Sequence, residues 1–199
     1  NLICEGMSWH EVERNYFTEM ASQDAQGVYI AAGPGGLPHG KVVPGEPMMF
    51  DALGQYHLYH GDIGRTAVFG EPSREVVRRS KAMMTGWAKA AEIMKPGLSG
   101  QELTSQVIDV IAREGFAGFM IVTPHSIGLE HTDHPLPIGP EVPGSKGDFI
   151  FLENMVVNID MPYIEHGWGA MHLEDTVLIT SDGFHPLTSQ ATELVVIDT

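Results

Sequence analysis

Cysteine is nearly absent from this chain, which contains a single one, Cys4. One cysteine excludes an internal disulfide, and it cannot supply the cysteine framework of a structural zinc site. Disulfides are rare in reducing compartments. We therefore expect the protein to be cytoplasmic.

Basic residues and long apolar runs are also scarce. The chain has 11 Lys and Arg against 26 Asp and Glu, a formal net charge of −15. That charge repels nucleic acid and anionic membrane surfaces, so we expect neither as a partner. No apolar stretch approaches the roughly 20 residues that cross a bilayer. The hydrophobic fraction of 43% is nevertheless enough for one substantial core.

The chain begins at Asn1, without an initiator methionine or a signal-like apolar segment. No linker, charge run or low-complexity tract divides it. We expect residues 1–199 to form a single domain, the C-terminal part of a longer chain whose N-terminal domain is missing.

A weak internal repeat relates the two halves of the chain. A Gly, a Ser and a Glu of segment 2–12 recur at a constant offset of 91 in segment 93–103, and segment 27–31 matches 118–122 at the same offset. Each copy has the pattern of a helix with a serine cap and a glutamate three residues later, followed by a buried strand. The repeat predicts a pseudo-two-fold α+β domain with a cleft at its axis.

Helices are predicted over three segments, and an apolar strand over a fourth. The capping residues Ser8 and Ser99 begin helices over residues 9–22 and 100–114. Another helix is expected over residues 73–94, before a Pro-Gly pair. The apolar run Phe119–Thr123 is expected to be a buried strand, with His125 just after it.

Two hairpin-like regions, residues 48–66 and 155–180, follow the repeated units. In each region, one acidic residue ends an apolar strand and a second lies on the returning strand. Asp51 therefore matches Asp160 in role, and Asp62 matches Glu174. Four acidic residues at equivalent places in a duplicated unit are harder to explain as turn or capping residues than one alone.

These carboxylates predict a metal centre. An acidic side chain beside an apolar strand is costly to bury unless it is paired or binds a cation. With His125, the four carboxylates make a donor set that suits two divalent ions such as Mn²⁺, Fe²⁺, Co²⁺ or Zn²⁺. Two such ions a few Å apart activate a bridging water and polarise the carbonyl or phosphoryl group that the water attacks.

Five segments give the chain a resemblance to a known family. They are 50–51 (FD) with 59–66 (YHGDIGRT), 125–129 (HSIGL), 155–160 (MVVNID), 173–177 (LEDTV) and 37–40 (LPHG). Together they resemble the catalytic domain of the methionine aminopeptidase, prolidase and creatinase family, which has the pita-bread fold. The likeness covers nearly the whole chain, and LPHG is similar to the segment found in the proline-specific branch.

The resemblance implies a pita-bread domain over residues 1–199, a curved antiparallel sheet backed by helices. It implies a hydrolase that uses two metal ions and a bridging water, most similar to Xaa-Pro dipeptidase and aminopeptidase P. Asp51 and Glu174 would chelate one or both ions, Asp62 and Asp160 would bridge or flank them, and His125 would cap one. The substrate would be a small peptide or another small molecule. Relatives in the proline-specific branch also imply a homodimer.

The same resemblance implies catalytic and substrate-contacting residues. Asp160 would act as proton shuttle, and His39 would contact the substrate or its developing charge. His131 and His134 flank Thr132, where the family has a histidine that holds the reacting carbonyl, so either is a candidate. Tyr163, between the second pair of ligands, lines the pocket or simply packs.

Two further positions depart from the family pattern. Asp160 stands where the family has Glu, which shortens the side chain by one methylene. His172 stands where the family has an Arg that orients the substrate carboxylate, so His172 would contact the substrate in its place. These changes keep open a creatinase-like enzyme or a dimethylsulfoniopropionate lyase-like enzyme. A metal-free, protein-binding relative is a second alternative.

Overall fold

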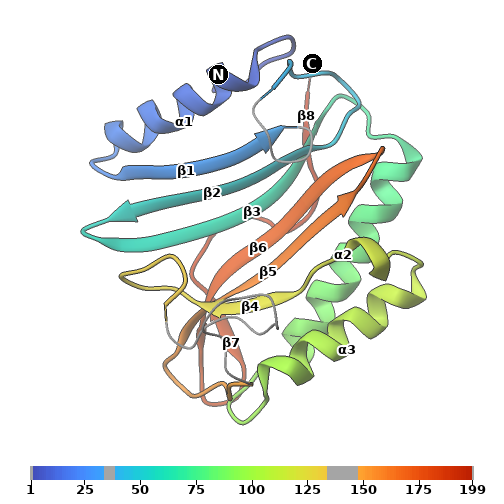
Figure 1. Ribbon diagram of the computed structural model, residues 1–199. Coiled ribbons are helices and arrows are strands. Elements are labelled where there is room, and N and C mark those ends of the chain that lie inside the picture. Colours follow the sequence, from blue (N-terminus) through green and yellow to red (C-terminus); the bar gives the residue numbers. More distant parts are fainter. Residues whose placement is uncertain (1, 34–38, 134–147, 199) are drawn as a thin grey trace.

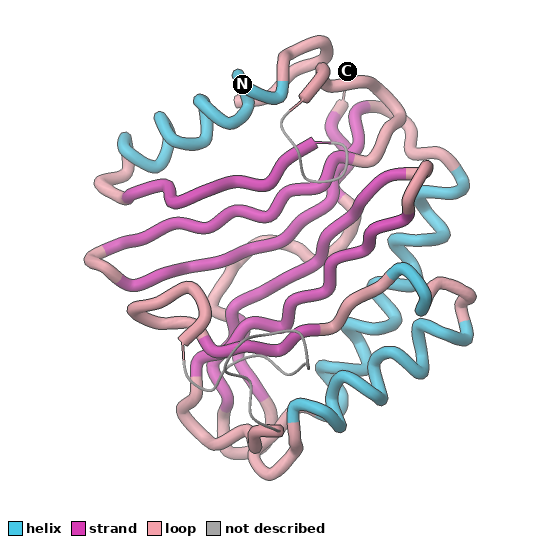
Figure 2. The backbone as a smooth tube through the Cα atoms, viewed as in Figure 1, coloured by secondary structure: helices cyan, strands magenta, loops and turns pink. Residues whose placement is uncertain are grey.

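The computed structural model describes residues 2–33, 39–133 and 148–198. One mixed sheet, with helices packed against it, makes up this part of the chain (Figures 1 and 2). The helices are α1 (Trp9–Ser22), α2 (Arg74–Ile93) and α3 (Gly100–Arg113). The strands are β1 (Gln26–Gly33), β2 (Met48–Tyr56), β3 (Tyr59–Phe69), β4 (Thr123–Ser126), β5 (Val156–Glu165), β6 (Gly169–Ile179), β7 (Phe184–Pro186) and β8 (Val195–Ile197).

Serine caps begin all three helices. The Ser8 hydroxyl accepts a hydrogen bond from the Glu11 amide at 3.3 Å, and the Glu11 carboxylate accepts one from the Ser8 amide at 3.0 Å. These reciprocal bonds satisfy two amides that a helix start leaves unpaired. Ser73 and Ser99 cap α2 and α3 in the same position. The predicted start and end of α1 are confirmed, and those of α2 and α3 are correct to within one residue.

The strand order is β1-β2-β3-β6-β5-β4, with β7 beside β6 and β8 beside β3. Each half of the chain thus supplies three successive strands in mirror order, as the internal repeat predicted. The two halves meet where β3 pairs with β6, at Ile63–Asp175 and Gly64–Glu174. The two predicted hairpins form β2-β3 and β5-β6. The pseudo-two-fold arrangement is therefore confirmed.

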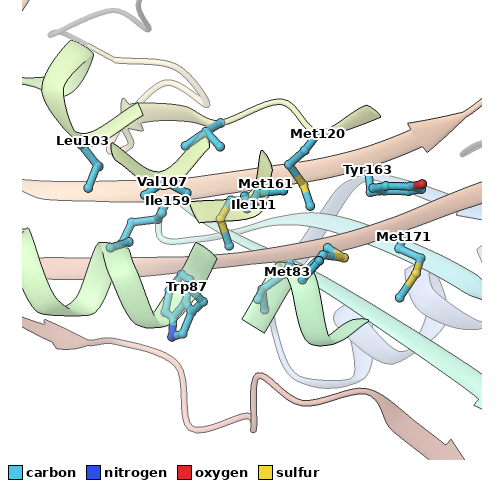
Figure 3. Close-up of a cluster of buried hydrophobic side chains, with 14 of the residues drawn as sticks. Met83, Trp87, Leu103, Val107, Ile111, Met120, Ile159, Met161, Tyr163 and Met171 are labelled. Atoms are coloured by element: carbon cyan, nitrogen blue, oxygen red, sulfur yellow. The ribbon is translucent and has the colours of Figure 1, made fainter. Parts of the chain in front are cut away.

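Side chains along each strand point alternately to the two faces of the sheet. In β5 and β6 the odd-numbered residues pack against α2 and α3 in one core cluster, which includes Met83, Trp87, Ile159 and Met161 (Figure 3). A second cluster joins α1, through Trp9, to β1, β2 and β3. The even-numbered residues of β5 and β6 point to the opposite face, where the polar side chains gather.

The prediction of a buried strand over Phe119–Thr123 is wrong. Residues Ala117–Phe119 form a 3₁₀ turn, and β4 begins only at Thr123, so His125 lies within the strand rather than after it. The run is apolar on both faces, which indicated a fully buried strand. In the fold only one face is covered: Met120 is buried, whereas Phe119 is 41% exposed.

The strict equivalence of the acidic residues also needs correction. Asp160 lies directly opposite Glu174 across the β5–β6 pair. In the first half, the residue directly opposite Asp62 is Leu53, and Asp51 lies opposite Gly64. The two acidic pairs therefore share a face of the sheet but not the same register.

Within the described residues, no helix combines the length and the apolar composition that a membrane span requires.

Candidate metal centre

One row of residues crosses five strands of the sheet on the face away from the helices. The register places Asp51 opposite Gly64, Gly64 opposite Glu174, Glu174 opposite Asp160, and Asp160 opposite Thr123. Residues directly opposite in antiparallel strands point to the same face. The row therefore brings three carboxylates from both halves of the chain to the middle of the sheet. Two residues from Gly64, and on the same face, lies Asp62.

A cavity of about 170 Å³ opens over this row. Its lining includes all five predicted metal ligands. The full described lining is Tyr29, Asp51, Asp62, Thr123, His125, His131, Thr132, Asp160 and Glu174. Glu174 is 2% exposed and Asp62 is 3% exposed. The site is thus a small polar chamber whose deepest donors have lost nearly all contact with water.

The donors form three groups, each able to surround one cation. The atoms of each group lie within 4.8 Å of one another. The groups are Asp62 with His125 and His131, Asp51 with His172 and Glu174, and His125 with Asp160 and Glu174. Because His125 and Glu174 each belong to two groups, the arrangement fits neighbouring ions that share ligands. Carboxylates with imidazoles suit Mn²⁺, Fe²⁺, Co²⁺ or Zn²⁺.

The carboxylates are crowded in a way that a cation would relieve. Burial, together with the charges of Asp160 and Asp62, raises the pKa of Glu174 well above its ordinary value. Burial likewise raises the pKa of Asp51 to about 6, despite the opposing effect of His172. The Asp62 Oδ1 atom is buried and accepts no hydrogen bond from the described residues. A bound cation would offset this burial and repulsion, so these properties are typical of a metal-binding donor set.

Side chains around the row hold the carboxylates by hydrogen bonds. Asn158 donates to Glu174 Oε1 at 2.8 Å. The Tyr29 hydroxyl lies 3.3 Å from both oxygens of Asp51, and Thr123 donates to Asp160 Oδ2 at 3.2 Å. Sequence reasoning missed these three residues. Asn158 and Thr123 lie two residues from the predicted ligands Asp160 and His125, and this even spacing was the available signal. The place of Tyr29 follows only from the strand pairing, because Tyr29 shares a face with Ala31, which lies opposite Asp51.

A buried ion pair ties the two halves together on the helix side of the row. Arg65 and Asp175 approach to 2.7 Å. The Arg65 guanidinium also donates to the backbone carbonyls of Gly64 and Glu174, both at 2.7 Å. Arg65 thereby fixes the backbone of two positions in the row across the β3–β6 junction. The family motif contained this arginine without indicating what it contacts.

His131 reaches the cavity, as one of the two predicted flanking histidines. Its Nε2 lies 3.0 Å from Asp62 Oδ2, and its ring contacts the rings of Tyr29 and His125 edge-on. Its side chain is still 41% exposed, so it stands between the buried donors and solvent. The other candidate, His134, lies outside the described residues.

His172 lies beneath the site rather than on its open surface. It is 3% exposed and is not among the described residues that line the cavity. Its Nε2 is 2.7 Å from Asp160 Oδ1. Burial opposes protonation of His172, but the hydrogen bond to Asp160 and the charge of Glu174 outweigh it and raise its pKa to about 9. The predicted substrate contact therefore finds no support in its position.

The two remaining candidates lie away from the cavity. His39 is exposed and does not belong to the described lining. Tyr163 is fully buried on the helix face, where its hydroxyl contacts Arg79 at 3.0 Å and also bonds Glu165. Of the two alternatives for Tyr163, packing is therefore the one that its position supports. Its odd number in β5 places it on the face opposite Asp160.

The chain belongs to metallopeptidase family M24, whose sequence model matches residues 2–181. The Xaa-Pro dipeptidase of Pyrococcus furiosus is 29% identical over 97% of the chain and 57% of its own length. The prolidase structure from Pyrococcus horikoshii OT3 matches with a TM-score of 0.85 and 27% identity, over 97% of this chain and 57% of that one.

The fold extends to more distant relatives. The dipeptidase PepE structure from Mycobacterium ulcerans has a TM-score of 0.88 at 22% identity and covers all of this chain and 55% of its own. These likenesses confirm the expected pita-bread fold. The chain spans somewhat more than half the length of these relatives.

Proposed function

We propose that this chain forms the catalytic domain of a dinuclear metal hydrolase that cleaves Xaa-Pro peptides. The observation that carries the proposal is the cavity in which five metal-competent side chains from both halves of the chain converge. Membership of family M24 and the likeness to an Xaa-Pro dipeptidase support the reaction class. A cytoplasmic location and a homodimeric state stay predictions.

Five residues would hold the two ions: Asp51, Asp62, His125, Asp160 and Glu174. When bound, two such ions supply an activated water and electrophilic stabilisation of the attacked carbonyl. Asp160 is the proposed proton shuttle. It is the most solvent-accessible of the paired β5–β6 donors, with 22% of its side chain exposed, and Thr123 and His172 orient its two oxygens.

His131 is the proposed substrate-positioning residue. Its partly exposed ring lies beside Asp62 and His125, where an imidazole can donate a hydrogen bond to a substrate carbonyl. His39 remains a weaker candidate for substrate contact because it lies outside the described lining. Tyr163 is left out of the proposed substrate site.

The test is proline release from a panel of Xaa-Pro peptides by the full-length protein loaded with Mn²⁺, Co²⁺ or Zn²⁺. Asp62→Ala is the loss-of-site variant, and His10→Gln, on the exposed face of α1, is the matched surface control. We expect release from wild type and His10→Gln and none above background from Asp62→Ala. Proline release by Asp62→Ala at the wild-type rate would contradict the assignment.

A non-peptidase of the same fold is the second candidate, because the described cavity lining contains no Lys or Arg to bind a substrate carboxylate. A creatinase-like or dimethylsulfoniopropionate lyase-like enzyme would explain the loss of the family arginine at His172. Assays for a small amine or for an alkene and a sulfide distinguish these reactions from proline release. A protein that binds no metal would instead favour the non-catalytic relative.

A further inference from the structure

We propose that Asn158, held in place by Thr176, is a positioning residue that fixes the Glu174 carboxylate for metal binding. This inference rests on the dinuclear site proposed above. Both side chains are buried, with Asn158 0% exposed and Thr176 6% exposed, and neither belongs to the described lining of the cavity. Any effect that they have on the site therefore passes through the ligands that they contact.

A second row of polar residues runs beside the row of carboxylates, on the same face of the sheet. The register places His125 opposite Asn158, and Asn158 opposite Thr176. The next step, across the β3–β6 junction, reaches Asp62, whose carbonyl oxygen lies 3.1 Å from the Thr176 hydroxyl. Predicted metal ligands therefore stand at both ends of this row, and two buried polar side chains lie between them.

The hydrogen bonds determine how the Asn158 amide is oriented. Its Nδ2 lies 2.8 Å from Glu174 Oε1, and its Oδ1 lies 2.7 Å from the Thr176 hydroxyl. An ionised carboxylate only accepts hydrogen bonds, so the NH₂ group of the amide must face Glu174. The carbonyl group of Asn158 then faces Thr176, which can donate to it. Thr176 therefore selects the amide orientation that Glu174 requires.

Asn158 in turn fixes the rotation of the Glu174 carboxylate. The oxygen that it holds, Oε1, lies 3.5 Å from His125 Nε2, whereas Oε2 is the oxygen that lies 3.5 Å from His172 Nε2. A carboxylate oxygen has two lone pairs, so Oε1 can accept from Asn158 and still bind a cation. The amide is also neutral, and it therefore orients the carboxylate without placing a positive charge that would repel a metal ion.

Thr176 also connects Glu174 to the strand that carries Asp62. In the described residues β3 and β6 pair at two positions, and Asp62 and Thr176 are the next residues along these strands. The Thr176 hydroxyl contacts the Asp62 carbonyl just beyond the last paired residues. One metal ligand from each half of the chain is thus held by the same pair of buried side chains.

Four variants of the full-length protein separate positioning from packing. Asn158→Leu removes the amide at nearly constant size, and Thr176→Val removes only the hydroxyl. Thr176→Ser is the conservative variant, because it keeps the hydroxyl. Ile159→Val is the matched control, since Ile159 is a buried neighbour of Asn158 in β5 that packs in the core on the helix face.

Metal affinity is measured by titration of metal-free protein with Zn²⁺ and Mn²⁺ against a chromophoric chelator, which requires no substrate. Urea denaturation with a chelator present measures the stability of each metal-free variant, and circular dichroism checks that it is folded. Proline release at saturating metal gives kcat and KM as a separate readout.

We expect Asn158→Leu to bind at least one of the two ions about 10- to 100-fold more weakly than wild type, the usual effect of losing a residue that orients a ligand. Thr176→Val should lose affinity in the same direction, and Thr176→Ser should restore it. Ile159→Val should lose stability but no metal affinity. At saturating metal, kcat of Asn158→Leu should fall with KM unchanged, because Asn158 does not line the described cavity.

Wild-type metal affinity in folded Asn158→Leu would overturn the positioning role and leave the proposed function standing. A Thr176→Ser variant that loses as much affinity as Thr176→Val would do the same, since packing would then be the cause. If Asn158→Leu does not fold, the comparison of the two Thr176 variants decides the question. No proline release by wild type, with the affinity losses as expected, would overturn the proposed reaction alone. Wild type that binds no metal would overturn both.

Discussion

At the scale of single residues, the candidate site buries several carboxylates close together, which is unfavourable in the protein without a bound cation. Burial, with a further effect of Asp62 and Asp160, raises the pKa of Asp51 to about 6. Its ordinary value is 3.8. A carboxyl group whose pKa is higher in the folded state binds protons more tightly there than in the unfolded chain. Its contribution to stability is therefore full at low pH and is lost as the pH rises to about 6.

Asp51→Asn should stabilise the metal-free protein while it removes a metal ligand. At pH 7 we expect the free energy of unfolding to rise by about 1–2 kcal/mol, since the variant no longer ionises in the site. The difference from wild type should shrink toward zero as the pH falls to about 4. Urea denaturation with a chelator present, from pH 4 to 7, measures it. A difference that is the same at every pH would show that charge is not the cause.

At the scale of secondary-structure elements, the β3–β6 junction decides the geometry of the site. Gly64 and Glu174 face each other there, and a Cβ at Gly64 would also come within 2.8 Å of the Glu174 Cβ. The glycine is required because the row has no space for another side chain. The same strand contains Gly61, where an added Cβ meets nothing within 4 Å.

Gly64→Ala should therefore destabilise the protein by about 1–3 kcal/mol and weaken metal binding, because His172 and Glu174 must move. Gly61→Ala is the matched control in the same strand, and its stability should change by less than about 0.5 kcal/mol. Urea denaturation and metal titration of both variants test this. Equal effects at the two glycines would mean that backbone freedom, not crowding at the row, sets the cost.

A second prediction about the β3–β6 junction concerns the Arg65–Asp175 ion pair. Arg65→Met leaves the Asp175 carboxylate, which is 1% exposed, buried without its cation. Loss of one partner of a buried pair costs about 3–5 kcal/mol. Arg78→Met, which breaks an exposed pair with Glu75, should cost less than about 1 kcal/mol. Thermal and urea unfolding compare the two, and similar small losses would show that the junction does not depend on the buried pair.

At the scale of the whole molecule, the metal site joins two halves that also meet where β3 pairs with β6 and with β8. In the described residues β3 pairs with β6 at two positions and with β8 at three. Asp51 and Asp62 come from the first half, and His125, Asp160 and Glu174 come from the second. Ions bound between them would add a further link between the two halves. A ligand that binds the folded state alone stabilises it by mass action.

Metal loading should raise the melting temperature of the full-length protein. A metal concentration about 100 times Kd contributes about 2.7 kcal/mol, which corresponds to roughly 5–10 °C for a chain of this size. A chelator should reverse the shift. Asp62→Ala should show little or no response to the same metals in differential scanning calorimetry. A full response in that variant would place the stabilising ions elsewhere.

Local patterns predicted much of this structure. The cap residues Ser8 and Ser99 marked helix starts, because each hydroxyl accepts a hydrogen bond from the amide of the Glu three residues later. The hairpins and the five candidate ligands followed from alternation and from motifs within single strands. What failed was the run Phe119–Thr123, since its apolar pattern could not reveal that one face is left uncovered.

The sequence by itself identified the family through short motifs and indicated the repeated halves through a similarity at a constant offset of 91, and it predicted which carboxylates bind metal. Only the tertiary structure decided which faces meet. It placed Tyr163 in the core behind Asp160 and brought His131 to Asp62 from another element. It also set the His172 ring over Gly64, a contact between strands more than a hundred residues apart. Such contacts depend on strand register and twist, which no local pattern encodes.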